Sequence, residues 1–144
     1  MVRMTLLISI LLLFSLSLSA PIDTRAVIIQ PEAIQPYEAL FNITCKVESS
    51  HRPNVIGDHG ESFGIAQIQQ IRLDDYFNLT GISYTTADCF NVDVSREIFL
   101  FFADRIGPYN MEAISRCWNG GPNGMNMEST EKYYLKVQKA LLSL

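Results

Sequence analysis

The chain has 144 residues, of which 48% are hydrophobic, and a formal net charge of −4 at pH 7. This length suits one domain with a single compact core. The acidic balance and the lack of any basic stripe argue against a nucleic-acid partner, whereas a neutral polysaccharide needs no counter-charge.

Residues 1–19 have the layout of a secretory signal peptide. A positive charge at Arg3 precedes an apolar run from Leu6 to Leu18, and small residues follow it. The run is shorter than the roughly 20 residues that a helix needs to cross a bilayer. We therefore expect a secreted or periplasmic protein of the cell envelope, without a stable membrane span after cleavage. An uncleaved membrane anchor is the alternative.

The proline-dotted residues 20–35 predict a linker, and residues 36–144 predict the folded domain. Pro36 suits the first turn of a helix, and apolar residues continue at helical spacing to about Ser50. This helix places Glu48 at its C-terminal end, where the helix dipole disfavours the ionised carboxylate and apolar neighbours raise its pKa further.

The rest of the chain also has mainly helical patterning. Residues 51–63 predict a loop, and Gly64 to Gln70 predict a short helical turn. Further helices are predicted over residues 71–79, from a cap at Asp93 or Ser95 to Ile106, from a cap at Asn110 to Trp118, and over residues 129–144 with a cap at Ser129 or Thr130. The helix that ends at Trp118 is followed directly by NGGPNG, which predicts a loop over residues 119–124.

Two apolar faces are predicted within these helices. Val94, Ile98, Phe101, Phe102 and Ile106 form the first, on what we expect to be the central buried helix. Tyr133, Val137, Ala140 and Leu141 form the second, on the last helix. Strand alternation never exceeds four residues, so we expect an all-α domain, α+β at most, with a glycine-rich loop that can include a short hairpin.

The cysteines leave two interpretations open. Cys45, Cys89 and Cys117 are odd in number, so at most one internal disulfide can form. Either they are small buried apolar residues, or Cys117 pairs with Cys45 or Cys89 in an oxidising compartment. Their spacing is not that of a metal site, and no metal or cofactor is predicted.

The stretch ESSHRPNVIGDHGESFGIAQIQ, from residue 48 to 69, concentrates the candidate chemistry. Glycoside cleavage needs a proton donor, often a glutamate with a raised pKa, and a hydrolase also needs a second carboxylate that activates water. Glu48 at a helix end and Asp58 in a glycine loop can supply such a pair across a cleft. In the simpler interpretation, Glu48 is an exposed carboxylate and Asp58 holds a turn, while Glu61 is a solvated loop charge.

This stretch resembles the active-site block of the goose-type lysozymes and of the soluble lytic transglycosylase domain. Glu48-Ser49 matches the Glu-Ser pair that ends a helix in the family, and Gly64-Ile65-Ala66-Gln67-Ile68 matches its Gly-hydrophobic-hydrophobic-Gln turn. Asp58 then falls on the family's second acid.

A second block agrees with this resemblance, which covers about residues 36–142. Trp118-Asn119-Gly120-Gly121-Pro122 resembles the Tyr-Asn-Ala-Gly-Pro signature of the transglycosylases, and Tyr133 begins a segment similar to the Tyr-Val-x-x-Val that follows it. The departures are Ala66 in place of a methionine, Glu61 and Ser62 in place of small residues or glycine, and Gln69 in place of a further goose-type acid.

The resemblance implies a compact lysozyme-like helical domain and assigns roles to seven residues. Glu48 would be the catalytic acid, or acid and base, and Asp58 the assisting carboxylate. The residues that would bind or orient the sugar are Ser49, Gln67, Trp118 and Asn119, with Tyr133 holding Glu48 in place.

The implied activity is that of a monomeric lytic transglycosylase, which cleaves the β-1,4 bond between N-acetylmuramic acid (MurNAc) and N-acetylglucosamine (GlcNAc) in the glycan strands of peptidoglycan. Two alternatives stay open. One is a goose-type muramidase that hydrolyses the same bond with the help of Asp58. The other is a non-catalytic glycan-binding module or an assembly component of an envelope or virion.

Overall fold

The computed structural model describes residues 37–107 and 109–143, which belong to one compact unit, Ala33–Leu144. The predicted signal peptide (1–19), the predicted linker (20–35) and Pro36 lie outside the described residues. Within the described part, no helix is both long enough and apolar enough to span a membrane.

The described chain is mostly helical, as predicted. Its α-helices are α2 (Glu38–Ser49), α3 (Gln70–Thr80), α4 (Val92–Ile106), α5 (Met111–Gly120) and α6 (Glu128–Leu141). Short 3-10 helices are η1 (Asp58–Gly60), η2 (Asp88–Phe90) and η3 (Gly121–Asn126). The NGGPNG segment is therefore ordered mainly as η3 and not as an irregular loop.

A small antiparallel sheet lies between α2 and α3 in the sequence. Its strands are β1 (Ile56–Gly57), β2 (Ser62–Phe63) and β3 (Ile68–Gln69), in the order β1-β2-β3. The hairpin that the glycine-rich loop allowed is present, and a third strand extends it. The helical turn predicted from Gly64 to Gln70 is wrong, because this segment makes turns and then β3, whose Ile68 is buried while Gln69 is exposed.

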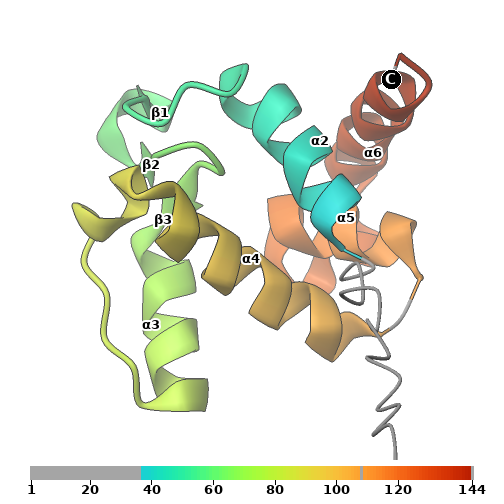
Figure 1. The fold of residues 1–144 in the computed structure, drawn as a ribbon. Coiled ribbons are helices and arrows are strands. Elements are labelled where there is room, and N and C mark those ends of the chain that lie inside the picture. Colours follow the sequence, from blue (N-terminus) through green and yellow to red (C-terminus); the bar gives the residue numbers. More distant parts are fainter. Residues whose placement is uncertain (1–36, 108, 144) are drawn as a thin grey trace, which may run out of the picture. The chain divides into compact units, whose positions relative to one another are not determined.

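The buried core forms around α4. Figure 1 shows this helix crossing the domain between α3 and the helices α2 and α5. Phe99, which is 0% exposed, packs against Phe41 of α2 with 5.5 Å between ring centroids. The centre of the buried face is formed by Ser95, Ile98, Phe99 and Ala103. Among the residues predicted to form the buried face, Ile98 is fully buried. The remaining ones are only partly buried: Val94, Phe101, Phe102 and Ile106.

The helix caps confirm some predictions and correct others. Asn110 caps α5 by accepting a hydrogen bond from the amide of Ala113, as predicted. In α4 the cap is Asn91, not Asp93 or Ser95, and Ser95 is buried and donates to the carbonyl of Cys89 instead. Neither Ser129 nor Thr130 caps α6, because the helix starts at Glu128 with Met127 at the cap position.

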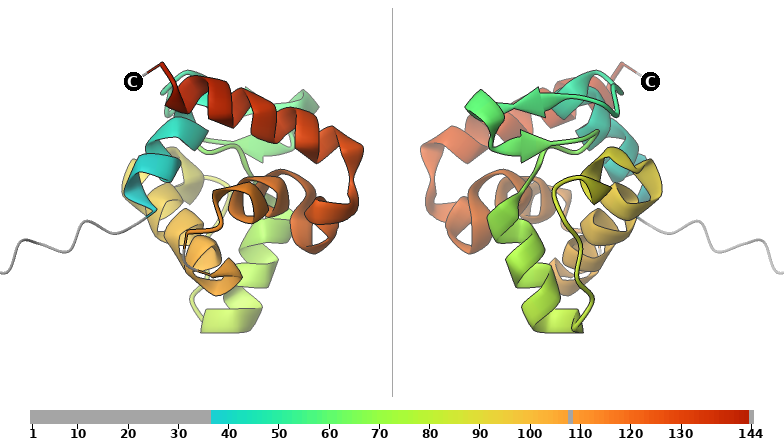
Figure 2. Two further views of the ribbon diagram at one scale, coloured as in Figure 1. Left: turned by 90° about the vertical axis from the view of Figure 1, so that its right-hand side faces the viewer. Right: turned by 90° about the vertical axis from the view of Figure 1, so that its left-hand side faces the viewer.

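Helix α6 packs against α2 and α5. The sheet and α6 lie at the same end of the domain, and α3 extends from the sheet toward the opposite end (Figures 1 and 2).

All three cysteines are free thiols, with Cys45 and Cys89 buried, so neither predicted disulfide is present.

Candidate active site

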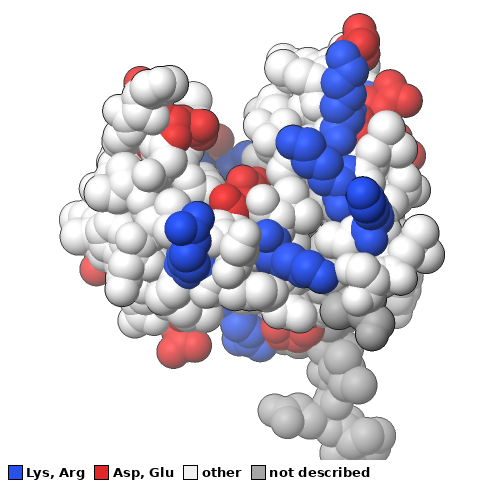
Figure 3. Space-filling model, turned by 90° about the horizontal axis from the view of Figure 1, so that it is seen from above, with Lys and Arg blue, Asp and Glu red and all other residues white. Residues whose placement is uncertain are grey.

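A cleft of about 430 Å³ lies between the sheet, α3 and the C-terminal end of α5. Its lining residues are Glu48, Asp58, Ser62, Gln67, Ile68, Gln69, Ile71, Arg72, Asp75, Trp118, Asn119, Gly120, Gly121 and Pro122. In the view from above, this end of the domain is hollowed, with acidic atoms in the hollow and basic side chains along one side of it (Figure 3).

Glu48 lies in the last turn of α2, half-buried at the wall of this cleft. Burial is the largest influence on its carboxyl group and raises the pKa to about 7, and the negative charge of Asp58 raises it as well. The hydroxyl of Tyr133 opposes this by donating to Oε1 over 2.8 Å. A carboxylic acid with this pKa can donate a proton near neutral pH.

Tyr133 is 7% exposed on α6 and does not line the cleft. Its pKa is raised by burial and by the neighbouring charge of Glu48, so the phenol stays protonated and can only donate to that carboxylate. The geometry therefore agrees with the role of holding Glu48 and offers no contact between Tyr133 and a bound sugar.

Asp58 begins η1 at the sheet side of the same cleft. Its Oδ2 accepts a hydrogen bond of 2.5 Å from the hydroxyl of Ser62. Ser62 is 1% exposed, and its oxygen in turn accepts a bond of 3.2 Å from the side-chain amide of Gln69. The second acid is thus fixed by side chains of β2 and β3.

Gln67 lines the cleft, yet its side chain is used to brace the loop. Its Nε2 donates to the carbonyl of Gly64 over 2.8 Å and to that of Val55 over 3.3 Å. Its Oε1 lies so close to Gly57 that a Cβ there would overlap it. Gln67 also has a φ of 53°, a left-handed conformation that non-glycine residues rarely adopt.

Ser49 does not face the cleft. It is 2% exposed, and its hydroxyl lies 3.0 Å from the carbonyl of Cys45 and 2.8 Å from that of Ile65. This contact ties the end of α2 to the turn before β3. Its predicted role in orienting the site agrees with this position, whereas a direct hydrogen bond to a sugar does not.

Trp118 forms part of both the core and the cleft wall. Its ring packs edge-on against Phe99 with 4.9 Å between centroids, and its Nε1 donates to the carbonyl of Ala66 over 3.3 Å. The guanidinium carbon of Arg72 lies 5.2 Å from the Trp118 ring centre, and Nη2 of Arg72 donates to the carbonyls of Cys117 and Trp118 at 3.1 Å each. Asn119, next in the chain, is exposed and lines the cleft.

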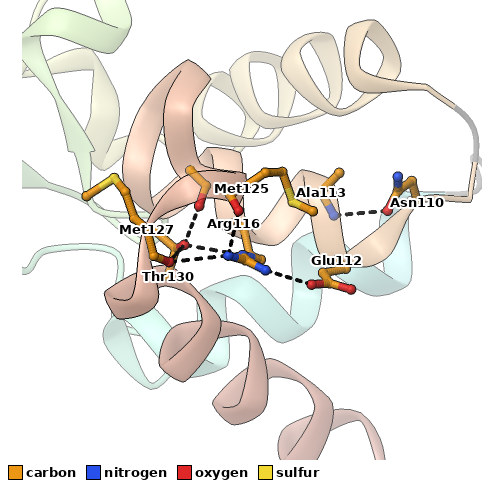
Figure 4. A network of polar contacts seen from close by, with 8 residues as sticks. Asn110, Glu112, Ala113, Arg116, Met125, Met127 and Thr130 are labelled. Carbon is orange, nitrogen blue, oxygen red and sulfur yellow. Dashed lines mark hydrogen bonds and ion pairs between the residues drawn. The ribbon is translucent and has the colours of Figure 1, made fainter.

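The segment after Asn119, which lines the cleft with Gly121 and Pro122, is held in place by a buried arginine. Arg116 is 9% exposed and donates to the carbonyls of Met125 and Met127, and it pairs with Glu112 at 2.8 Å (Figure 4). Thr130 completes this network through its bond to Arg116. These contacts fasten η3 to α5 and α6, and so hold Gly121 and Pro122 at the cleft.

The structure brings five of the seven predicted site residues to one cleft and puts Ser49 and Tyr133 directly behind it. It also adds residues that were not predicted to line the site, among them Ser62, Arg72 and Asp75. Ser62 and Gln69 had stood out in the sequence only as departures from the resembled pattern. Among residues 37–107 and 109–143, no group of three or more His, Cys, Asp or Glu side chains is placed to hold a metal ion.

The chain was also compared with known proteins. No family model, no curated protein and no solved structure matches it. Its function is therefore proposed from the site together with the sequence resemblance.

Proposed function

We propose that this protein cleaves the β-1,4 bond between MurNAc and GlcNAc in peptidoglycan, as a lytic transglycosylase with Glu48 as its acid and base. The observation that carries the proposal is Glu48 itself: a half-buried carboxyl group at the wall of a cleft, with a pKa of about 7 and a hydrogen bond from Tyr133. The helical fold with its small sheet is compatible with a lysozyme-like domain.

In this reaction Glu48 donates its proton to the glycosidic oxygen, and the bond from that oxygen to C1 of MurNAc breaks. The 6-hydroxyl of the same sugar then attacks C1, and its proton passes back to Glu48. The product has a 1,6-anhydro end, and no second protein carboxylate is required. Trp118 offers a flat face for a sugar ring, and Asn119 offers an exposed amide.

Hydrolysis of the same bond is the second candidate, and Asp58 favours it. A hydrolase with inversion needs a second carboxylate that takes a proton from the attacking water. Asp58 lines the same cleft as Glu48 and is held by Ser62. In this route the hydroxide adds to C1 and leaves a reducing end.

Analysis of the products from purified sacculi tests the proposal. Ends that resist reduction indicate transglycosylation, and reducible ends indicate hydrolysis. Glu48→Gln is expected to abolish both without loss of folding, whereas Glu61→Gln, an exposed carboxylate of the same loop that does not line the cleft, keeps the wild-type rate. Lysis by Glu48→Gln at the wild-type rate would show that the assigned mechanism is wrong.

A non-catalytic glycan-binding module is the remaining alternative. It predicts that the wild-type protein binds sacculi without releasing either kind of end, and that Glu48→Gln binds equally well. Secretion or export to the periplasm is proposed with the enzymatic function, because the substrate lies outside the cytoplasm.

A further inference from the structure

A chain of hydrogen bonds runs from Gln69 through Ser62 to Asp58 and ends in the cleft. We propose that Ser62 and Gln69 are positioning residues that aim Asp58 at the attacking water, so that this protein has a hydrolytic route beside transglycosylation. This inference rests on the proposed function, since it concerns the same cleft and the same bond.

The direction of the chain follows from what each group can donate. The side-chain Nε2 of Gln69 can only donate, so Oγ of Ser62 accepts from it. The single hydrogen of the Ser62 hydroxyl is then directed to Oδ2 of Asp58, over 2.5 Å. Within the described residues, Oδ1 of Asp58 has no hydrogen-bond partner, which leaves that oxygen to accept a proton from water.

The register of the sheet aligns the side chains of Gln69, Ser62 and Asp58. Ser62 on β2 is opposite Gly57 of β1, which directly precedes Asp58, and it is opposite Gln69 of β3 on its other side. Ser62 is 1% exposed, while Asp58 and Gln69 are exposed. The middle member of the chain is therefore fixed by the core, and the outer members reach the cleft from it.

The backbone at Asp58 needs such support. Asp58 has a φ of 47° and His59 a φ of 57°. Two consecutive non-glycine residues in the left-handed region are uncommon, and such conformations persist where the surroundings hold them. The hydroxyl of Ser62 is the side-chain contact that acts on Asp58 directly.

A purely structural role for Ser62, as a support for the turn, is separated from a positioning role by a double-mutant cycle. The rates of release of reducing ends and of anhydro ends from sacculi are measured for wild type, Ser62→Ala, Asp58→Asn and the double variant. If Ser62 acts through Asp58, Ser62→Ala slows the release of reducing ends about tenfold in the wild-type background and less than about twofold in the Asp58→Asn background. The release of anhydro ends changes less than about twofold in either.

Gln69→Met is a second variant, at an exposed position. Methionine has nearly the shape of glutamine but lacks the amide donor that orients the Ser62 hydroxyl, so the release of reducing ends is expected to fall while anhydro ends persist. Gln70→Met is the matched control, since Gln70 is the next residue, is exposed and does not line the cleft. It is expected to release both kinds of end at the wild-type rates.

This inference would be overturned if Ser62→Ala slowed the release of reducing ends equally in the wild-type and the Asp58→Asn backgrounds. An active wild type that releases no reducing ends would overturn it as well. Either result would leave transglycosylation intact. A wild type that releases neither kind of end would instead contradict the proposed function, and the inference with it.

Discussion

At the scale of single residues, Glu48 has neighbours that act on its proton affinity in opposite directions. Burial and the charge of Asp58 raise its pKa, whereas the Tyr133 hydroxyl and the charge of Lys136 lower it. The resulting pKa of about 7 leaves a large fraction of the group protonated near neutral pH. The pH dependence of the reaction therefore depends on contacts that can be changed one at a time.

Tyr133→Phe removes the hydrogen bond that favours the ionised form of Glu48. Its pKa is then expected to rise further above about 7, so the fall of activity at high pH moves to higher pH. The maximal rate is expected to decrease about tenfold, because the carboxyl group loses its orientation. A pH–rate profile measures both effects.

Tyr134→Phe is the control for this change, because the neighbouring Tyr134 is half-buried and its hydroxyl has no hydrogen bond to any described residue. It is expected to keep the wild-type profile. A Tyr133→Phe profile that coincides with that of wild type would contradict the role of Tyr133 as the partner of Glu48.

The raised pKa of Glu48 also affects stability. Its value is about 7 in the folded chain against the ordinary 4.5 of a solvated glutamate, so the folded state binds more protons between these values. Its contribution is favourable below pH 4.5 and is lost as the pH rises through 7. At about 1.4 kcal/mol per pKa unit, the free energy of unfolding that is lost is on the order of 3 kcal/mol.

Glutamine does not titrate, so Glu48→Gln avoids this loss. Its free energy of unfolding minus that of wild type is therefore expected to be about 3 kcal/mol larger at pH 9 than at pH 4. Urea unfolding at these two pH values measures the difference. The exposed variant Glu61→Gln serves as control and is expected to show no comparable change. A Glu48→Gln variant whose relative stability is the same at both pH values would mean that Glu48 is not buried as described.

The sequence predicted Glu48, Asp58, Trp118 and Asn119 at one site, and the structure places them around one cleft. It could not predict the orientation of Ser49. Successive residues of an α-helix are about 100° apart around its axis, so Glu48 and Ser49 cannot both face the same cleft. Burial of Glu48 at the wall of the cleft directs Ser49 to the carbonyl of Ile65.

At the scale of elements, the strands were the least predictable part of the fold. Each strand has two residues, which is too short for alternation to show. What specifies the sheet is the packing of its turns, such as Gly64, whose amide donates to the carbonyl of Val55 over 2.9 Å. The helices α3 and α5 were predictable because Gly81, at the end of α3, and Asn110, at the start of α5, act locally.

Gly64 and Gly60 allow the contribution of packing to be separated from that of backbone conformation. Both have positive φ, 75° and 104°, so alanine is strained at either position. A Cβ on Gly64 would also overlap the carbonyl of Cys89, whereas nothing lies within 4 Å of one on Gly60. Gly60→Ala is expected to cost about 1–2 kcal/mol.

Gly64→Ala is expected to cost about 1–3 kcal/mol more than Gly60→Ala, because the sheet must move away from η2. Chemical denaturation gives both values. Equal costs at the two glycines would mean that the sheet does not pack on η2 as closely as described.

The face of α4 shows why the helical pattern alone was insufficient. Aromatic residues cover several sides of this helix, so the sequence pattern did not single out the side that is most deeply buried. The structure puts Phe99 between Phe41 and Trp118 at the centre. Phe101 and Phe102 instead pack beside Tyr76.

At the scale of the whole molecule, the described fold is held without a disulfide. Cys45 and Cys89 are buried, and burial raises the pKa values of their thiols to about 12 and about 11. Because the thiolate is the reactive form, both are expected to resist alkylation in the folded protein. Cys117 is partly exposed and is the thiol expected to react first.

Mass spectrometry after iodoacetamide treatment is expected to find at most one modified cysteine in the native protein and three in urea. A reductant is expected to leave the melting temperature unchanged. A melting temperature that falls on reduction, or fewer than three reactive thiols in unfolded protein that has not been reduced, would instead support a disulfide.

The bond between Tyr133 and Glu48 joins positions 85 residues apart in the chain. The glutamate is made early in synthesis, while its partner lies on the last helix. Until α6 docks against α2, Glu48 lacks the hydroxyl that orients its carboxyl group. A ribosome-bound or unfolded chain thus carries the acid without its partner, and the two meet only after the C-terminal helix has docked.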